Sequence, residues 1–220
     1  MRFTNNGIAV PSQDTHLGPW VEQANKLCHD PKVEVFAKTY LKPGDWVVDG
    51  GCNIGDHTIA YCEAVGLEGK VLAFDPNPEV LACCAINCRA ASCFGVALWS
   101  DFGMLQFNIV DGNVGSSHVW EHGQTKVMAC PLDALKLQRL NLLKLDIEGS
   151  EYEALAGAIE TIKRCKPIIF IEVNPGCLGR LRSNYQSILE LIVPTGYKTE
   201  LFDQSQGFEL LQTDVVFFPI

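Results

Sequence analysis

The sequence predicts an α/β protein with a Rossmann-like fold, in which helices cover both faces of a mostly parallel sheet. Short apolar runs typical of buried strands alternate with longer amphipathic stretches typical of helices from residue 43 onward. Turns rich in glycine and aspartate follow the strands expected at residues 46–49 and 70–74. Two further strand-like runs flank a short Gln/Ser/Gly turn near the end of the chain. We therefore expect a seven-stranded sheet that is parallel except for a C-terminal antiparallel hairpin.

The expected elements follow one another without a linker or an internal repeat. Strands are expected at residues 46–49, 70–74, 93–98, 126–129, 142–147, 168–173, 197–202 and 213–218, and helices at residues 31–41, 55–65, 78–89, 150–164 and 185–193. Residues 1–42 form an N-terminal cap segment before a core of residues 43–220, and residues 103–130 form an extended insertion in that core. The whole chain, residues 1–220, is expected to be a single domain.

Capping signals support the helix starts. Asp30 and Asn77 each stand directly before a proline, which suits an N-cap followed by proline at the first helical position. Ser150 and Glu153 have the spacing of a capping box, so a single long amphipathic helix is expected after them. Glu151 is interpreted as an acid that stabilises the first turn of this helix.

Composition and charge exclude several classes of function. The 220 residues include 17 Lys and Arg against 26 Asp and Glu, a formal net charge of −9 at pH 7. This balance disfavours a nucleic-acid partner, because nucleic-acid binding depends on neutralising phosphates. No apolar run reaches the roughly 18 residues that cross a membrane, and residues 1–10 lack the regions of a signal peptide. We expect a cytoplasmic protein without a membrane partner, and the oligomeric state stays open.

Ten cysteines suit the same compartment as free thiols. Cys84 and Cys88 lie close together on an expected helix, with Cys83 and Cys93 nearby, but the spacing matches none of the usual zinc patterns. Free cysteine commonly packs as a small apolar side chain. We therefore predict no zinc site.

A glycine-rich turn after the first core strand indicates a ligand. Residues 49–55, DGGCNIG in one-letter code, connect that strand to a helix. Gly51 and Gly55 allow a tight turn and close approach of a ligand to the backbone, although a tight turn without a ligand is the simpler alternative. Asp49 narrows the choice of ligand, because a carboxylate at this turn would repel the pyrophosphate of a dinucleotide and attract ammonium and sulfonium groups. S-adenosylmethionine carries both cations and is the expected cofactor.

The second core strand ends in Asp75, 26 residues after Asp49. In a Rossmann unit, an acidic residue at about this distance accepts hydrogen bonds from ribose hydroxyls. Asp75 could instead cap the next helix, but Asn77 stands directly before Pro78 and is better placed for that role. We therefore assign Asp75 to the cofactor.

The strand expected before the longest helix carries charges that buried parallel strands rarely contain. Lys144, Asp146 and Glu148 alternate along it, so their side chains are expected on one face of the sheet. Lys144 requires a carboxylate partner, for which Asp146, Asp49 and Glu172 are candidates. These charged residues either take part in the function of the protein or form an ion pair with a purely structural role.

Methyl transfer from a sulfonium to a hydroxyl needs in-line alignment and removal of one proton. Asp146 is expected at the strand end that faces the cleft, so we assign it to orienting the reactants and to proton removal, with Glu148 as the alternative base. Lys144 would hold these carboxylates in place. His57, at the start of a helix, and His16, in the N-terminal segment, are rival bases.

Three runs of residues together resemble the FkbM family of methyltransferases. They are residues 49–58 (DGGCNIGDHT), 73–78 (AFDPNP) and 143–151 (LKLDIEGSE), with residues 131–133 and 169–172 as lesser landmarks. The resemblance covers about residues 14–175. It implies a class I methyltransferase fold, S-adenosylmethionine as cofactor, and O-methylation of a hydroxyl on a sugar or small metabolite.

The sequence departs from the family pattern at two positions in these runs. Cys52 stands where members of the family usually have alanine, and Asp75 stands where they usually have glutamate. The shorter acid would weaken the ribose contact without abolishing it. Residues 176–220 carry no signature of the family, so the acceptor is the least defined part of this expectation.

The expected site combines the residues above. The cofactor-binding residues are Asp49, Gly50, Gly51, Asn53, Gly55, Thr58, Asp75, Pro76 and Ala97. The catalytic residues are Asp146, Glu148, Lys144 and His57, and no metal ion is expected. The acceptor is expected to be a small molecule or a carbohydrate. Two other functions stay open. The first is non-catalytic binding of S-adenosylmethionine. The second is that of an NAD-dependent oxidoreductase, which is less favoured because Asp49 would repel the pyrophosphate of NAD.

Overall fold

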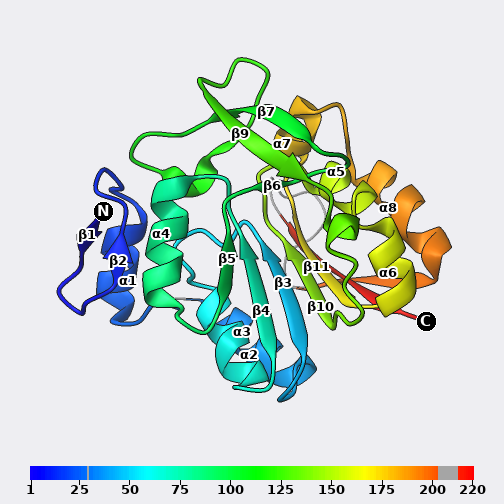
Figure 1. Cartoon of the computed structure of the whole chain (residues 1–220), viewed down its shortest axis with the longest axis horizontal. Coiled ribbons are helices and arrows are strands. Elements are labelled where there is room, and N and C mark those ends of the chain that lie inside the picture. The colour runs from blue at the N-terminus through cyan, green and yellow to red at the C-terminus, as the bar shows by residue number, and fades with distance from the viewer. Residues whose placement is uncertain (29, 203–212) are drawn as a thin grey trace. The chain divides into compact units, whose positions relative to one another are not determined.

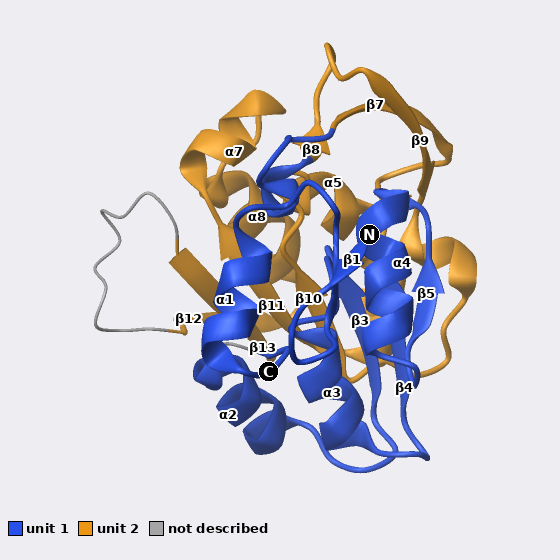
Figure 2. Cartoon of the chain, turned by 90° about the vertical axis from the view of Figure 1, so that its left-hand side faces the viewer, with its two compact units in different colours: residues 1–96, 109–117 blue, residues 97–108, 118–220 orange. Residues whose placement is uncertain are grey.

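The computed structural model describes residues 1–28, 30–202 and 213–220 (Figure 1). Contacts within the chain divide it into two compact units, which Figure 2 shows in different colours. The first unit comprises residues 1–96 and 109–117, and the second comprises residues 97–108 and 118–220. The insertion expected at residues 103–130 therefore contributes to both units.

The first unit combines parallel strands with helices. Its strands are β1 (Arg2–Phe3), β2 (Ala9–Val10), β3 (Trp46–Gly50), β4 (Lys70–Phe74) and β5 (Ser92–Phe94). Its helices are α1 (Leu17–Ala24), α2 (Pro31–Tyr40), α3 (Thr58–Val65), α4 (Pro78–Asn87) and the 3-10 helix η1 (Val114–Ser116). β3, β4 and β5 pair parallel in that order. β1 pairs antiparallel with β2, and neither of these two strands was predicted.

Burial accounts for the apolar composition of the parallel strands. Val47 and Val48 of β3 are fully buried, as is Ala73 of β4. Helix α3 packs on β3 and β4, whereas α4 packs on β5 and on β2. A fully buried valine stabilises the fold by about 1.5–3 kcal/mol relative to an exposed one. Because Gly50 lies opposite Phe74, the loops that follow β3 and β4 start at the same edge.

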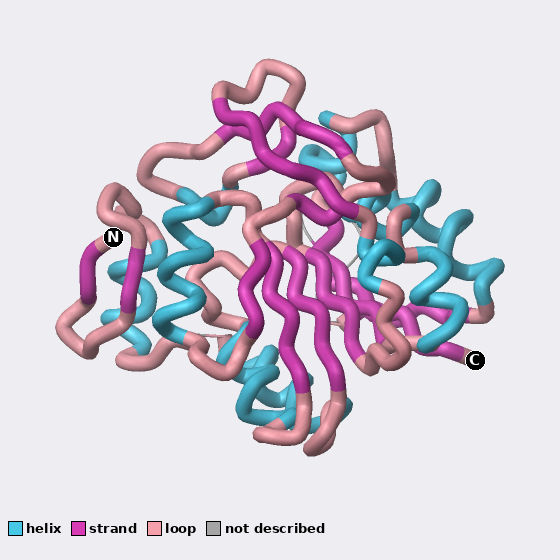
Figure 3. The backbone as a smooth tube through the Cα atoms, viewed as in Figure 1, coloured by secondary structure: helices cyan, strands magenta, loops and turns pink. Residues whose placement is uncertain are grey.

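The second unit contains two groups of strands, drawn in magenta in Figure 3. The strands are β6 (Ala97–Leu98), β7 (Gly103–Asn108), β8 (His118–Val119), β9 (Thr125–Cys130), β10 (Leu142–Leu145), β11 (Ile168–Val173), β12 (Tyr197–Leu201) and β13 (Thr213–Pro219). The helices are η2 (Leu132–Leu135), α5 (Glu151–Ala156), α6 (Ile159–Cys165), α7 (Pro175–Arg180), α8 (Tyr185–Ile192) and η3 (Val193–Thr195).

Strand pairing in the second unit matches the expected mixture of parallel and antiparallel neighbours. β10 pairs parallel with β11, whereas β13 lies antiparallel between β11 and β12. The turn expected between β12 and β13 lies outside the described residues. In the insertion, β9 pairs parallel with β6 and antiparallel with β7, and β7 pairs antiparallel with β8.

Two predicted helix caps are confirmed. The side chain of Asp30 accepts a hydrogen bond from the backbone N–H of Lys32 at the start of α2. Asn77 accepts one from the N–H of Glu79 at the start of α4. Each cap satisfies a backbone donor that the helix cannot pair internally, and the cap at Asn77 leaves Asp75 for another role.

The single helix expected over residues 150–164 is wrong. The structure has two helices, α5 and α6, and Ser150 makes no capping hydrogen bond through its side chain. A Cβ on Gly157, between the two helices, would lie 1.9 Å from the carbonyl oxygen of Trp99. The carboxylate of Asp133 accepts hydrogen bonds of 3.0 and 2.7 Å from two backbone amides of α6. Tertiary contacts therefore break a helix that local periodicity would continue.

Other predicted boundaries also move. The strand expected at residues 93–98 is two strands, β5 and β6, separated by Gly95 and Val96. Helix α3 starts at Thr58 instead of Gly55, because Gly55 has a φ of +93°, outside the helical region. Strand β10 ends at Leu145, so the acids that follow it lie in a turn.

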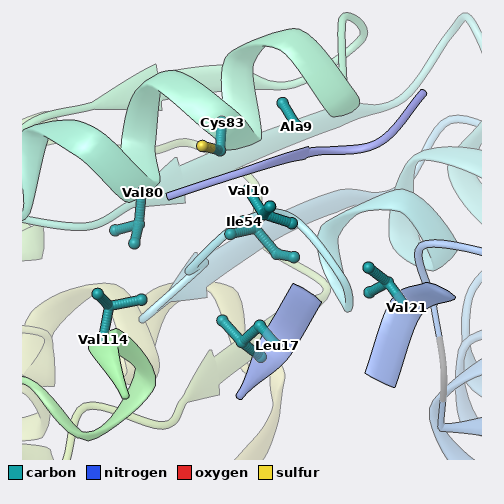
Figure 4. Packing of buried hydrophobic residues seen from close by; sticks show 8 residues of the cluster. All are labelled: Ala9, Val10, Leu17, Val21, Ile54, Val80, Cys83 and Val114. Carbon is teal, nitrogen blue, oxygen red and sulfur yellow. The ribbon is translucent and has the colours of Figure 1, made fainter. Parts of the chain in front are cut away.

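A buried cluster fastens the N-terminal segment to the glycine-rich turn (Figure 4). Its members are Ala9, Val10, Leu17, Val21, Ile54, Val80, Cys83 and Val114. Ile54 belongs to the turn and is fully buried. Figure 4 shows it beside Val10, with Leu17 and Val21 of α1 close by. The conformation of the turn therefore depends on packing by a segment more than 30 residues earlier in the chain.

Candidate functional site

The turn after β3 has a backbone that only certain residues tolerate. Gly51, Asn53 and Gly55 have φ values of +74°, +48° and +93°, in the left-handed region. The amide of Gly51 donates a 2.9 Å hydrogen bond to the carbonyl oxygen of Phe74. A Cβ on Gly55 would lie 2.5 Å from Sγ of Cys88. Both conformation and packing thus require glycine at position 55.

Asp49 lies buried at the end of β3. Its side chain is inaccessible to solvent, and the hydroxyl of Thr58 donates a 2.6 Å hydrogen bond to its Oδ2. Thr58 is itself fully buried at the start of α3. A buried carboxylate is unfavourable unless hydrogen bonds or a cation compensate its charge. The structure therefore brings together two residues that the sequence predicted for the cofactor, with Thr58 directed at Asp49.

Asp75 links the turns that follow β3 and β4. Its Oδ2 accepts a 3.2 Å hydrogen bond from the backbone N–H of Asn53, and its Oδ1 accepts one of 2.8 Å from Asn77. The carboxylate is half-buried, and Pro76 beside it is half-buried as well. Two backbone donors fix its direction while its oxygens keep capacity to accept further hydrogen bonds.

Two buried polar atoms near this turn lack a partner in the described part of the chain. They are Oδ1 of Asn53 and Nδ1 of His57. Leaving a buried acceptor unpaired costs about 1–3 kcal/mol, so native proteins seldom do so without a ligand or water. The amide nitrogen of Asn53 faces Gly115, where a Cβ would lie 3.3 Å from it. The turn therefore presents unsatisfied hydrogen-bonding groups that suit a polar ligand.

The rival bases have different surroundings. Nε2 of His57 lies 3.8 Å from Oδ2 of Asp56, and about a fifth of the imidazole side chain is exposed. The ring of His16 lies 4.4 Å from the ring of Trp20, one turn further along α1. His57 is thus next to the glycine-rich turn in sequence and retains an unpaired ring nitrogen, which keeps it a candidate.

Asn87 is a supporting residue that sequence reasoning missed. Its Nδ2 donates hydrogen bonds of 2.8 Å to the carbonyl of Ile54 and of 2.9 Å to the carbonyl of Ala9. Its Oδ1 accepts a 2.9 Å hydrogen bond from the N–H of Ala9. One amide at the end of α4 therefore joins the N-terminal segment to the glycine-rich turn. No local pattern signals this role, because its partners lie 33 and 78 residues away.

The cysteines behind the turn pack as buried thiols. Cys88 donates a 3.3 Å hydrogen bond from Sγ to the carbonyl of Gly55, and Sγ of Cys84 lies 3.9 Å from the hydroxyl of Thr58. Cys52, the departure from the family pattern, is buried in the same cluster. These thiols fill the space under the turn and support its conformation.

In the second unit, Lys144 is buried in the middle of an apolar strand. It lies opposite Phe170 of β11, and only 2% of its side chain is exposed. Its Nζ lies 3.7 Å from Oδ2 of Asp146. Asp146 was one of the partners expected for this lysine, and the structure confirms the pair.

Three carboxylates converge next to this pair. One oxygen from each of Asp146, Glu148 and Glu172 lies within 4.8 Å of the others. The expected cause was strand alternation, but Glu148 has a φ of +54° in a turn beyond β10. The turn, and not the pleat, brings Glu148 to Asp146. Glu172 lies on β11 and was expected only as a partner for Lys144.

Glu148 is held by helix α7. The thiol of Cys177 donates a 3.3 Å hydrogen bond to its Oε2. Arg180 donates a 3.2 Å hydrogen bond to its backbone carbonyl, and its guanidinium lies 3.9 Å from Oε2. Burial and, to a lesser extent, the charge of Asp146 raise the pKa of Glu148 above its ordinary value. A carboxylate with a raised pKa is a better proton acceptor at neutral pH.

Ala97 has a different environment from the one expected. It lies in β6 opposite Ala129, and its methyl group packs in a buried cluster with Phe107, Val119 and Val127. The side chain therefore belongs to the core of the insertion. Its assignment to the cofactor stays a prediction.

Two comparisons bear on the class of protein. The methyltransferase FkbM from Methylobacillus flagellatus superposes with a TM-score of 0.54 at 16% identity, over 91% of this chain and 58% of that one. Fibrillarin from Aeropyrum pernix, solved with bound S-adenosylmethionine, gives a TM-score of 0.52 at 9% identity, over 84% of this chain and 74% of that one. The fold is that of the class I S-adenosylmethionine-dependent methyltransferases.

The family follows from the sequence itself. Residues 49–210 match the family model described as the methyltransferase FkbM domain. The chain belongs to the FkbM methyltransferase family, and S-adenosylmethionine is its cofactor. None of the described helices is long and apolar enough to cross a membrane.

Two curated proteins are also similar to this chain in sequence, one over most of its length and one over part of it. The 2-O-methyltransferase NoeI of Sinorhizobium fredii is 22% identical over 219 residues, which cover 87% of this chain and 88% of that protein. A demethylmenaquinone methyltransferase of Lactobacillus johnsonii is 33% identical over 91 residues. That match covers 37% of this chain and only 36% of the relative, about a third of its length.

The residues of the first unit fit the cofactor. Asp49 provides a buried negative charge, which suits a ligand with an ammonium and a sulfonium group. Asp75 is fixed by two backbone amides with acceptor capacity left for hydroxyls. The unpaired Oδ1 of Asn53 is a further acceptor for a polar group. This chemistry disfavours the pyrophosphate of NAD at the same turn.

Proposed function

We propose that the chain transfers a methyl group from S-adenosylmethionine to a hydroxyl of a sugar, a glycan or a small metabolite. The observation that carries the proposal is the group of Asp146, Glu148 and Glu172, whose carboxylate oxygens lie within 4.8 Å of one another in a methyltransferase chain. Acceptor hydroxyls must lose a proton, and carboxylates can accept it. The name of NoeI, a 2-O-methyltransferase, supports the same chemistry for this chain.

The proposal assigns cofactor binding to the first unit. S-adenosylmethionine, when bound, supplies the electrophilic methyl group. Asp49 attracts its positive charge, with Thr58 fixing the carboxylate. Asp75 accepts hydrogen bonds from the ribose, and Asn53 contributes its unpaired oxygen. Gly50, Gly51 and Gly55, with Pro76, allow the backbone to approach the ligand.

The proposal assigns proton removal to the acids after β10. Asp146 orients the acceptor and takes its proton, and Glu148 is the alternative base because burial raises its pKa. Lys144 holds the carboxylate of Asp146 from 3.7 Å away and stays buried itself. His57 remains a rival base. The acceptor is a small molecule or carbohydrate and not a nucleic acid, in keeping with the net charge of −9.

The decisive experiment measures S-adenosylhomocysteine release. The purified chain is incubated with S-adenosylmethionine and a panel of monosaccharides, oligosaccharides and hydroxylated metabolites, with the double variant Asp146→Asn/Glu148→Gln as matched control. Release that depends on one acceptor, with the methyl group located on oxygen by mass spectrometry and NMR, is the expected result. Methylation of nitrogen or carbon instead would overturn the assignment to hydroxyls.

A non-catalytic protein that binds S-adenosylmethionine is the second candidate. It would bind the cofactor with unchanged affinity in the double variant and would release S-adenosylhomocysteine with no acceptor of the panel. The buried lysine and three convergent acids argue against it, because such a costly arrangement is seldom kept without a role. Preferential binding of NAD would favour an oxidoreductase instead.

A further inference from the structure

Glu151 has an environment that its position in the sequence does not suggest. It is the first residue of α5, where acids usually stabilise the helix from an exposed position. Here the residue is only 2% exposed. Burying a carboxylate is unfavourable unless hydrogen bonds or a cation compensate the loss of hydration. The hydrogen bonds of Glu151 therefore indicate its role.

One oxygen of Glu151 holds the turn that carries the proposed bases. Oε1 accepts hydrogen bonds of 3.0 Å from the backbone N–H of Ile147 and of 3.2 Å from the N–H of Gly149. These two amides flank Glu148. The second oxygen, Oε2, has no hydrogen-bond partner in the described part of the chain. The side chain thus uses a single acceptor atom to fix both sides of one residue.

The turn needs such support because its backbone is unusual. Glu148 and Gly149 have φ values of +54° and +104°, and left-handed glutamate is uncommon. A Cβ on Gly149 would lie 2.3 Å from the carbonyl of Cys177, so helix α7 closes the other side of the turn. Between Glu151 and α7, the turn has little freedom to move. Its direction decides where the side chain of Glu148 points.

We propose that Glu151 is a positioning residue, which sets the geometry of the turn from Asp146 to Glu148 for methyl transfer by accepting both flanking amides. This rests on the proposed function, since the acids matter only if they act on the acceptor. Glu151 acts through the backbone and does not touch the reactants. The neutral side chain of glutamine retains the acceptor oxygen, so the acceptor and not the charge should be essential.

Hydrogen–deuterium exchange tests the positioning role without any acceptor. In Glu151→Ala the amides of Ile147 and Gly149 lose their partner, and their exchange should accelerate at least about ten-fold. In Glu151→Gln both amides should stay protected. Glu153→Ala is the matched control, because Glu153 lies in the same helical turn. If Glu151→Ala does not fold, Glu151→Asp replaces it, since the shorter side chain also withdraws the acceptor.

Kinetics complete the test. With the acceptor found by the release assay, Glu151→Ala should lower kcat about 10²-fold, as a misplacement of about 1 Å can, while calorimetry shows S-adenosylhomocysteine binding within about three-fold of wild type. Glu151→Gln should restore turnover. Unchanged exchange in both Glu151→Ala and Glu151→Asp, or a glutamine variant as impaired as alanine, would overturn the proposal. Wild type that methylates no acceptor would overturn the proposed function instead, and exchange would still decide the role of Glu151.

Discussion

The hydroxyl of Thr58 lies 2.6 Å from Oδ2 of Asp49, and both side chains are fully buried. The hydrogen bond ties the first residue of α3 to the end of β3. A hydroxyl that donates to a buried carboxylate holds it in one orientation and stabilises its charged form. In the proposed function, Thr58 therefore supports the carboxylate that would attract the positive charge of the cofactor.

Replacing this hydroxyl should weaken cofactor binding. Thr58→Val keeps the shape of the side chain but leaves Asp49 without this donor. Hydrogen bonds to charged groups contribute about 1.5–3 kcal/mol, so the Kd for S-adenosylhomocysteine should rise about ten-fold to a hundred-fold. Isothermal titration calorimetry measures the change, and Thr58→Ser, which keeps the donor, is the control. Equal affinities of Thr58→Val and wild type would contradict the role of Thr58.

Asp75 gives a second prediction for the same ligand. Its carboxylate is aimed by the amides of Asn53 and Asn77, and its proposed partners are the ribose hydroxyls. Asp75→Ala should weaken S-adenosylhomocysteine binding about ten-fold or more. Asp101→Ala removes an exposed acid and should leave the affinity unchanged. The assignment fails if calorimetry finds the two variants alike.

The glycine-rich turn was predictable because its signals are local. Glycines at positions 51 and 55 encode left-handed backbone, and Asn77 before a proline encodes a helix cap. Because Asn77 was the better cap, Asp75 was assigned to the cofactor; the structure confirms the cap at Asn77, whereas the cofactor role of Asp75 stays a prediction. Each inference needed only a few neighbouring residues.

The turn after β10 was predicted in composition but not in geometry. Strand alternation predicted that Asp146 and Glu148 lie close together. The strand, however, ends at Leu145, and the left-handed backbone of Glu148 brings its side chain to Asp146. Ser150 and Glu151 followed the pattern of an exposed helix start, whereas both are buried. Burial depends on what the rest of the chain packs against a residue, and a local pattern does not contain that information.

The proposed bases can be separated by turnover and binding. Asp146→Asn preserves shape and removes charge, so turnover should fall about 10²–10⁴-fold while S-adenosylhomocysteine binding changes little. Glu148→Gln should produce a smaller loss if Asp146 is the base and the larger one if Glu148 is. Radiolabelled methyl transfer under single-turnover conditions measures both. Near-normal rates in these two variants, with loss of activity in His57→Ala or His16→Ala, would show that a histidine is the base.

The stability of the protein should depend on the titration of Glu151. Burial is the main cause that raises its pKa from 4.5 to about 7 in the folded protein. The folded protein therefore binds more protons than the unfolded chain between these values. The contribution of Glu151 to stability is fully present below pH 4.5 and is lost as the pH rises to about 7. The loss is on the order of 3 kcal/mol.

Urea denaturation at several pH values checks this dependence. Glutamine does not titrate, so Glu151→Gln should gain on wild type by about this amount as the pH rises from 4.5 to about 7. Glu148 has a pKa shift in the same direction, so the variant should retain part of the wild-type pH dependence. Parallel stability curves for wild type and Glu151→Gln would show that Glu151 has an ordinary pKa.

Methyl transfer should not require a metal ion, although Asp146, Glu148 and Glu172 could hold one by distance alone. Oxygen ligands at this spacing suit magnesium or calcium. The ammonium of Lys144, however, lies 3.7 Å from Asp146 and would repel a divalent cation. In addition, Glu148 accepts a hydrogen bond from the thiol of Cys177. We therefore expect these three acids to act without a bound metal ion.

Chelation decides between these uses of the acids. The enzyme is treated with EDTA and dialysed, and methyl transfer is then measured with and without added magnesium or calcium. Unchanged turnover is the expected result, together with no heat of binding when magnesium chloride is titrated into the protein. The variant Glu172→Gln distinguishes the two cases further. If Glu172 is a metal ligand, the variant should need a higher magnesium concentration for activity. If no metal binds, the activity of the variant should not depend on magnesium. Activity that disappears with EDTA and returns with magnesium would show that the three acids are ligands and that Lys144 does not exclude the cation.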